Sequence, residues 1–349
     1  MTTVKSPGGP AGRILVVGGY GAVGATVTST LDAWFPGRAV PGGRDAARAR
    51  RLGGVGVDVT DPEDLLRVLE VLSDVTAVVL CVEPPDARVA RVCLERGVHV
   101  VDVGATARLL DDVGALHGVA ADAGATAVLS VGLAPGLTNL LAHRAHDAVG
   151  GADGIDLTVL LGSGERHGAD ALRWTVAGLA EPVSVRPLRT ELPGHGSRTA
   201  HPFPFSDQHT LPRTLGVARV TTRLCLDSRL LTGVLFALRR TGVTRAAARP
   251  DVQRRLAALT RRVRVGGDGF VIRADARRGG RHAAYALTGR GQSRVTGLVA
   301  AYVTREVVTG RVSAGVHHIE QIPRLAGLPE DLGRHGVTLL RPPGGTAER

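Results

Sequence analysis

Lysine is nearly missing from this sequence. Of the 43 lysine and arginine residues only Lys5 is a lysine, and it lies in a Pro- and Gly-rich stretch ahead of the first apolar run. This scarcity argues against a catalytic lysine, whether it forms a Schiff base or donates a proton. Acid–base chemistry is therefore expected from histidine, aspartate, glutamate, tyrosine or cysteine.

Aromatic residues are also few, at 3% of the chain, and no basic stretch is interleaved with them. Proteins that bind single-stranded nucleic acid use aromatic side chains as stacking platforms. We therefore expect no nucleic-acid partner, despite a net charge of +11. The positive charge fits a cleft for an anionic cofactor and an acidic substrate instead.

Cysteines and long apolar runs are scarce as well. Cys81, Cys93 and Cys225 follow neither a metal-binding spacing nor a disulfide framework, so no metal site is expected. No apolar run reaches the ~18 residues of a membrane-spanning helix. No apolar signal segment precedes the first expected strand. We therefore expect a soluble, cytoplasmic protein that does not contact a membrane.

What the sequence does contain is a glycine-rich turn between an expected strand and an expected helix. The apolar run at 14–17 is followed by Gly19-x-Gly21-x-x-Gly24, and apolar residues then recur at helical spacing. In such a turn the first glycine permits a tight bend, the second lets the backbone approach a pyrophosphate, and the third lets the helix pack closely. This context predicts a dinucleotide site, and the alternative is a plain glycine-rich turn. The intervening residues of the predicted site are Tyr20, Ala22 and Val23.

The end of the second expected strand indicates which nicotinamide cofactor binds. In an NAD site an acidic residue stands about 20 residues after the glycines and binds the ribose hydroxyls. Here Gly43 takes that position and Arg44 follows it. An arginine can pair with the 2′-phosphate of NADP. A shift by one residue would place Asp45 there instead, so NADP is predicted and NAD stays an alternative.

Strand-like and helix-like segments alternate along the first part of the chain. This pattern predicts an α/β fold class, a Rossmann doubly wound parallel sheet with a second α+β substrate domain. A single helix is expected at 109–123. Thr60 is expected to cap a helix in a capping box with Glu63. Residues 183–215 are expected to be irregular. The expected division is a flexible tail at 1–12, an NAD(P)-binding Rossmann domain at 13–140, a substrate and dimerisation α+β domain at 141–290, a return to the Rossmann domain at 291–340 and a flexible tail at 341–349.

Several segments of the chain resemble a known family. VVGGYGAVG, PGGRD, CLERGVHVVDVGAT and the Gly-Leu-Ala-Pro-Gly turn at 132–136 are similar to the saccharopine dehydrogenase-like NAD(P)-dependent reductases, over residues 13–140. The resemblance implies a Rossmann domain, an α/β substrate domain, and hydride transfer between NAD(P)H and an imine or secondary amine carbon. The lysine-forming branch of the family uses a Lys/His pair. Because this chain has no lysine to supply it, the lysine-forming activity is not expected.

The same resemblance implies cofactor contacts at several strand ends. Asp58 and Val59 would border the adenine. The turn that contains Gly132 and Pro135 would close one wall of the site, and we assign it to the substrate. The residues implied near the nicotinamide are Cys81, Val82, Glu83, Pro84, Val103 and Gly104.

The polar cluster Glu165-Arg166-His167 follows an apolar strand and a Gly-Ser-Gly turn, where site residues commonly lie. His167 is expected to move a proton near neutral pH, and Glu165 is grouped with it as a catalytic candidate. Arg166 or Arg173 is expected to clamp a substrate carboxylate. The alternative for this segment is a solvated loop that caps a helix.

A second group of candidates follows further along the chain. Trp174 is expected either to wall the pocket or to lie in the core. Phe203 and Phe205 are candidate apolar walls of the substrate site. Asp207 is a candidate catalytic residue that would pair with a substrate ammonium, and it is equally a candidate helix N-cap.

These features predict an NADP(H)-dependent oxidoreductase of the saccharopine dehydrogenase-like type. Its substrate is expected to be a small molecule, an imine formed from an amine and an oxo acid or other carbonyl compound, or the reverse. One alternative is a carbonyl or C=C reductase of a biosynthetic intermediate. Another is a non-catalytic NADP-binding regulatory protein, because fold alone does not establish turnover. A homodimer is expected.

Overall fold

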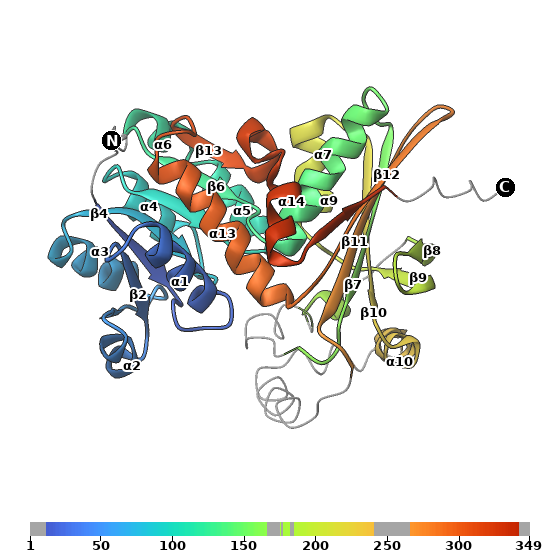
Figure 1. The fold of residues 1–349 in the computed structure, drawn as a ribbon. Coiled ribbons are helices and arrows are strands. Elements are labelled where there is room, and N and C mark those ends of the chain that lie inside the picture. The colour runs from blue at the N-terminus through green and yellow to red at the C-terminus, as the bar shows by residue number, and fades with distance from the viewer. Residues whose placement is uncertain (1–11, 166–174, 176, 182–184, 241–265, 342–349) are drawn as a thin grey trace, which may run out of the picture. The chain divides into compact units, whose positions relative to one another are not determined.

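The structure, a computed structural model, describes residues 12–165, 175, 177–181, 185–240 and 266–341 (Figure 1). The described residues fall into two compact units. The first lies within Met1–Gly104, Arg108–Val131 and Gly297–His317. The second lies within Ala105–Ala107, Gly132–Thr296 and His318–Arg349. The predicted return segment 291–340 is thus divided between the two units.

The first unit is built on a seven-stranded sheet with the order β13-β6-β5-β4-β1-β2-β3. Strands β1 to β6 pair in parallel, which confirms the predicted Rossmann-type sheet. The strands are β1 (Arg13–Val17), β2 (Ala39–Gly43), β3 (Val55–Gly56), β4 (Val75–Leu80), β5 (His99–Asp102), β6 (Thr126–Leu129) and β13 (Gly315–His318).

Helices cover both faces of this sheet. Leu15 and Leu80 belong to an apolar cluster that also includes Leu65 and Leu110 from the helices. Ile14 points to the opposite face, because side chains alternate along a strand, and it is equally buried. The helices of this unit are α1 (Gly24–Trp34), α2 (Ala46–Arg51), α3 (Pro62–Val71), α4 (Arg88–Leu94), α5 (Ala107–Gly114), α6 (His117–Asp122) and the later part of α13 (Gln292–Val308).

Helix α13 returns late in the sequence to pack beside α1. A Cβ atom on Gly297 would lie 2.7 Å from Val23 O and from Thr26 Cβ, so the two helices approach closely at this glycine. Further along, the rings of Trp34 and Tyr302 meet edge to face with centroids 5.0 Å apart. The long apolar helix predicted at 293–308 is therefore present and has a clear packing role.

The second unit contains a mixed seven-stranded sheet with the order β14-β12-β11-β7-β10-β9-β8. Helices α7 (Thr138–Ala148) and α9 (Asp207–Leu215) pack on it, α7 against β11 and β12 and α9 against β10. This mixed sheet confirms the predicted α+β character of the second domain. The strands are β7 (Gly154–Leu161), β8 (Leu188–Leu192), β9 (Gly196–Pro202), β10 (Arg219–Leu226), β11 (Gly269–Arg278), β12 (Arg281–Arg290) and β14 (Thr338–Leu340).

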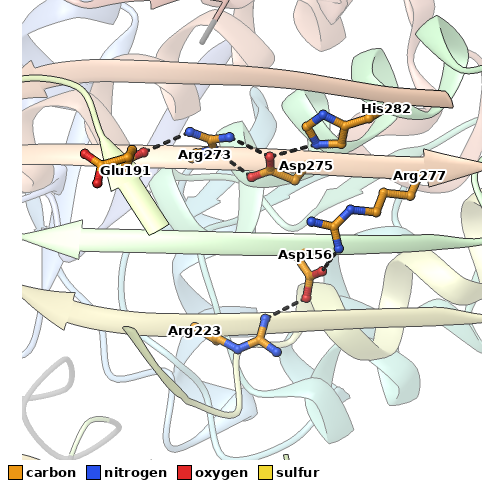
Figure 2. A network of polar contacts seen from close by, with 7 residues as sticks. All are labelled: Asp156, Glu191, Arg223, Arg273, Asp275, Arg277 and His282. Carbon is orange, nitrogen blue, oxygen red and sulfur yellow. Dashed lines mark hydrogen bonds and ion pairs between the residues drawn. The ribbon is translucent and has the colours of Figure 1, made fainter. Parts of the chain in front are cut away.

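Charged side chains lie along neighbouring strands of this sheet (Figure 2). Arg273 on β11 forms a two-point ion pair with Asp275, whose carboxylate also contacts His282 Nε2 at 3.0 Å. Asp156 on β7 accepts from Arg223 at 2.6 Å and from Arg277 at 3.5 Å. Arg273 is only 3% exposed, so its pairing with Asp275 offsets a large desolvation cost.

Three sequence expectations are wrong in detail. The helix expected at 109–123 is two helices, α5 and α6, which are separated at residues 115–116. Asp61, and not Thr60, caps α3, because the Asp61 side chain accepts the Glu63 N–H at 3.0 Å. Residues 183–215 are not all irregular: strands β8 and β9 form a hairpin and α9 follows.

Candidate functional site

The glycine turn links β1 to α1. Gly18 has φ +77°, in the left-handed region, and its carbonyl accepts the Gly21 N–H at 2.8 Å. A Cβ atom on Gly24 would lie 2.2 Å from Gly18 O, and one on Gly19 would lie 2.8 Å from Pro41 Cα. Both positions therefore require glycine because backbone atoms fill the space that a side chain would need.

Gly21 differs from these two glycines. A Cβ atom there would meet only Gly18 O, at 3.1 Å. Packing within the described chain therefore gives a much weaker reason for glycine at this position. The space left open lies at the start of α1, which has neither a side-chain cap nor an acidic residue in its first turn. Unsatisfied N–H groups and the helix dipole favour an anion there, so the turn fits a pyrophosphate.

Tyr20 fills the space between the glycine turn and the end of β2. Its hydroxyl accepts the Asp45 N–H at 2.9 Å. The Arg48 guanidinium lies over its ring, 4.6 Å from the centroid, and donates to Tyr20 O at 3.2 Å. A Cβ atom on Gly43 would lie 2.5 Å from the Tyr20 hydroxyl. Tyr20 therefore occupies the space that a side chain would need at the position that is acidic in NAD sites.

Asp45, the residue that left NAD as an alternative, has a structural role. Its carboxylate accepts the Arg48 N–H at 2.9 Å and caps α2. Arg44 is exposed, and no carboxylate within the described residues forms an ion pair with it. This arrangement favours the 2′-phosphate of NADP at the end of β2. Sequence reasoning missed Arg48, whose spacing from the glycines gave no signal.

The carboxyl ends of β1, β4 and β5 lie side by side. Cys81 N–H donates to Val17 O at 2.9 Å, and Val103 N–H donates to Leu80 O at 3.1 Å. These contacts bring the candidate segments 81–84 and 103–104 to the same edge of the sheet as the glycine turn. Burial raises the pKa of the Cys81 thiol to about 12, so this group stays protonated and is not a nucleophile near neutral pH.

Asp102 is a residue at this edge that the sequence analysis did not single out. It is the last residue of β5, is 1% exposed, and accepts the Gly104 N–H at 2.7 Å. Burial raises the pKa of its carboxyl group to about 6, and the charge of Glu83 adds to the effect. A Cβ atom on Gly104 would lie 2.9 Å from this carboxylate, which explains the glycine.

Asp58 and Val59, the implied adenine neighbours, follow β3. The Asp58 carboxylate accepts both the N–H and the hydroxyl of Thr60, and the Asp58 N–H donates to Asp64 at 2.7 Å. Val59 is buried. These contacts give both residues a role in the turn between β3 and α3.

In the second unit a polar network holds the Gly132–Gly136 turn. The turn includes a cis peptide bond before Pro135 and a left-handed Gly136 with φ +132°. The Gly136 N–H donates to Asn139 Oδ1 at 3.0 Å, and Asn139 Nδ2 donates to Glu320 Oε2 at 3.1 Å. Burial raises the pKa of Glu320. Asn139 and Glu320 were both missed, since nothing in the sequence relates two residues so far apart.

Asp207 is fully buried at the start of α9, and its carboxylate accepts from the Thr222 hydroxyl on β10. Burial raises its pKa to about 6. Within the described residues its Oδ2 atom and the neighbouring Ser206 hydroxyl have no hydrogen-bond partner. Ser206, and not Asp207, is the N-cap position of α9. The carboxyl group of Asp207 is therefore shielded from solvent in this structure, and its contact with a substrate ammonium stays a prediction.

The remaining candidates divide into core residues, a helix cap and residues outside the described part. Phe203 and Phe205 are buried, with ring centroids 5.2 Å apart, and so belong to the core. Glu165 accepts the N–H groups of Gln292 and Ser293 at 2.7 Å each and caps α13. Arg166, His167, Arg173 and Trp174 lie outside the described residues.

Among the described residues, no helix is long and apolar enough to cross a membrane. In the same part of the chain, no three His, Cys, Asp or Glu side chains are grouped as a metal site requires.

Comparison with known proteins gives one family match. Residues 14–128 match the family model described as the saccharopine dehydrogenase NADP binding domain. Solved structures with a similar fold include DAP dehydrogenase of C. glutamicum in complex with DAP, at 17% identity over 93% of this chain and 99% of that chain, with TM-score 0.50. Another is an engineered D-amino acid dehydrogenase bound to NADP+, at 16% identity over 92% and 98%, with TM-score 0.51. A comparison with curated proteins finds no match.

The parallel sheet and its glycine turn define the first unit as a dinucleotide-binding domain, in a chain with the two-domain fold of the dehydrogenases above. The family match makes this more specific. Residues 14–128 match the saccharopine dehydrogenase NADP binding domain, and this match indicates NADP as the cofactor of the first unit. The family resemblance, the fold class and the cofactor predicted from the sequence are thereby confirmed.

Proposed function

We propose that this protein is an NADP(H)-dependent oxidoreductase that reduces an imine, formed from an amine and an oxo acid, or catalyses the reverse oxidation. The observation that supports the proposal most directly is the NADP-binding domain, in which Asp45 caps α2 and Arg44, at the end of β2, has no carboxylate partner among the described residues. In the reductive direction, NADPH, a proton and the C=N bond give NADP+ and a CH–NH bond.

The residues of the first unit have distinct roles in this proposal. The backbone N–H groups at Ala22, Val23 and Gly24 bind the pyrophosphate, and Arg44 binds the 2′-phosphate. The segments at 81–84 and 103–104 border the nicotinamide. When bound, NADP(H) supplies or accepts the hydride, so the protein must chiefly orient the reactant and exclude water.

The proposed substrate class rests on chemistry and on fold likeness. One solved structure of similar fold is named for DAP and another for D-amino acids, compounds whose reacting carbon bears nitrogen. In our proposal the second unit binds the substrate through the backbone of the Gly132–Gly136 turn. His167 donates the proton, and Arg166 or Arg173 pairs with the carboxylate, as the sequence predicted.

The proposal is tested by following NADPH absorbance with a panel of oxo acids, each with and without an amine. We expect oxidation of NADPH only when both reactants are present, and faster turnover with NADPH than with NADH. Oxidation with an oxo compound alone would indicate a carbonyl reductase and refute imine reduction. Saturable NADPH binding without turnover across the whole panel would indicate the regulatory protein instead.

A further inference from the structure

A pocket of about 300 Å³ lies in the second unit between the β8–β9 hairpin and α10 (Arg229–Arg240), away from the Gly132–Gly136 turn in sequence. Three arginines line it, Arg189 from β8, Arg198 from β9 and Arg229 from α10. We call this the arginine pocket. Its volume is at the lower end of the range for small-molecule sites, so it suits a small ligand or one group of a larger ligand.

Packing contacts position the arginines around the pocket. The ring of His201 on β9 stacks on Phe236 of α10, with centroids 4.2 Å apart and an interplanar angle of 11°. Arg229 donates to Ser197 O at 3.1 Å, and Arg189 donates to the Ser197 hydroxyl at 2.7 Å. Ser197 therefore holds one arginine from the helix and one from the hairpin toward the same space.

The pocket is positive because three arginines line it and its described lining residues include no acidic side chain. Within the described residues, none of the three arginines forms an ion pair with a carboxylate. The nearby Asp227 carboxylate is already occupied, since it accepts from Ser163, Ser228 and Gly267. Arg189 and Arg229 are exposed and partly screened by solvent, whereas Arg198 is half-buried, so an anionic ligand would gain most beside Arg198.

Arg198 gives an independent sign of a ligand. Its Nε atom is buried and has no hydrogen-bond acceptor within the described residues. Its terminal nitrogens reach only carbonyl oxygens, those of Ser197 and Asp227, each at 3.4 Å. Burying a charged donor without an acceptor is costly. An oxygen of an anionic ligand would supply the acceptor that the Arg198 guanidinium lacks.

The geometry points to a binding site for a dianionic phosphate group, either inorganic phosphate or a phosphomonoester, in the arginine pocket. Several guanidinium groups match the tetrahedral oxygens of phosphate, and the hydroxyl of Thr199 and that of Thr232 lie in the same lining. This site lies in the second unit and does not depend on the proposed oxidoreductase activity.

Isothermal titration of the full chain with inorganic phosphate at constant ionic strength tests the proposal. We expect saturable binding that R198Q and R229Q each weaken at least tenfold. R108Q is the matched control, because Arg108 is 91% exposed on α5 in the first unit, and it should leave the affinity unchanged. Circular dichroism of each variant verifies that the fold is retained.

A variant that fills the pocket gives a second test that leaves every arginine in place. A Cβ atom on Gly233 would meet no atom within 4 Å, and Gly233 lies in α10, where leucine is a better helix former. G233L should therefore fold and lose phosphate binding. Equal affinity in the wild type, R198Q, R229Q and G233L would overturn the proposal, and so would the lack of saturable binding up to about 10 mM phosphate.

A parallel titration with glycerol phosphate distinguishes the two sources of the phosphate group. Tighter binding than that of inorganic phosphate, lost again in R198Q, supports a phosphomonoester ligand. Equal or weaker binding supports inorganic phosphate. Phosphate binding at the glycine turn of the first unit would give a different result, because substitutions at Arg198 and Gly233 do not alter the NADP-binding domain and would leave such binding unchanged.

Discussion

Substituting Arg44 by alanine should convert the protein from a strong into a weak discriminator of NADPH over NADH. Arg44 follows β2, is exposed, and has no carboxylate partner within the described residues. Only NADPH carries the 2′-phosphate that we assign to it. The loss of affinity should therefore be confined to NADPH, while NADH keeps the pyrophosphate contacts at the glycine turn.

The size of the effect follows from the exposure of the site. A hydrogen bond to a charged group contributes about 1.5–3 kcal/mol. Because Arg44 is exposed, solvent and salt screen the interaction, and the lower end of that range applies. With each 1.4 kcal/mol worth about a factor of ten, NADPH affinity should fall roughly tenfold to thirtyfold. The affinity for NADH should change by less than about twofold.

Fluorescence titration of NADPH and NADH against the wild type and R44A measures both affinities. R50A is the matched control, because Arg50 is also exposed and lies on the following helix α2. It should change neither affinity, apart from the weak general effect of one positive charge. Equal losses for both cofactors in R44A, or the same NADPH loss in R50A, would refute the assignment of the 2′-phosphate to Arg44.

Three further predictions follow from burial and close approach. R273M should lower the free energy of unfolding by about 3 kcal/mol in urea denaturation, because it removes the two-point ion pair of the buried Asp275 carboxylate and leaves only the contact with His282. R277M, at a side chain 46% exposed, should cost less than about 1 kcal/mol, and similar costs for the two variants would contradict this reasoning. G21A should keep the stability of the wild type and lower the affinities for NADPH and NADH equally, whereas G24A should unfold at a lower temperature than the wild type. A lower unfolding temperature for G21A than for G24A would be inconsistent with the turn geometry. Burial raises the pKa of Asp207 to about 6 from its ordinary value of 3.8, so the folded state retains its proton to higher pH. The resulting stabilisation is complete below about pH 4 and is lost as pH rises through about 6. Relative to D207N, the wild type should therefore lose up to about 3 kcal/mol between these limits, and parallel stability curves for the two proteins would exclude a buried, titrating carboxyl group.

The first unit was predictable because its key features are local. The turn at Gly19–Gly24 lies between its strand and its helix in the sequence, and the glycines are needed for contacts with nearby backbone. Pro41 is instructive as well: β2 pairs with β3 only from Gly42 onward, one residue after the proline, which has no N–H to donate. Such rules act over a few residues, so the sequence alone reveals them.

The prediction of irregular chain at 183–215 was wrong because distant segments decide the structure there. Strand β9 pairs with β8 in a hairpin and with β10 at His201 and Pro202, but its stretch of Pro, His and Ser suggested irregular chain. Asp207 was a candidate site residue or helix N-cap, and nothing in the sequence indicated that it is buried, since aspartate rarely is. Its burial follows from the docking of α9 on β10, which no local pattern reports.

The two units therefore differ in how their chemistry is encoded. The cofactor turn uses backbone groups, which any sequence with glycine at the right spacing can present. The second unit instead fixes its Gly132–Gly136 turn with side chains that are 181 residues apart in the chain, Asn139 and Glu320. These two groups are buried, so removing either one takes a hydrogen-bond partner away from the other inside the protein. A single substitution in this network should therefore alter the turn and the stability together, whereas a substitution at Arg44 should alter cofactor affinity alone.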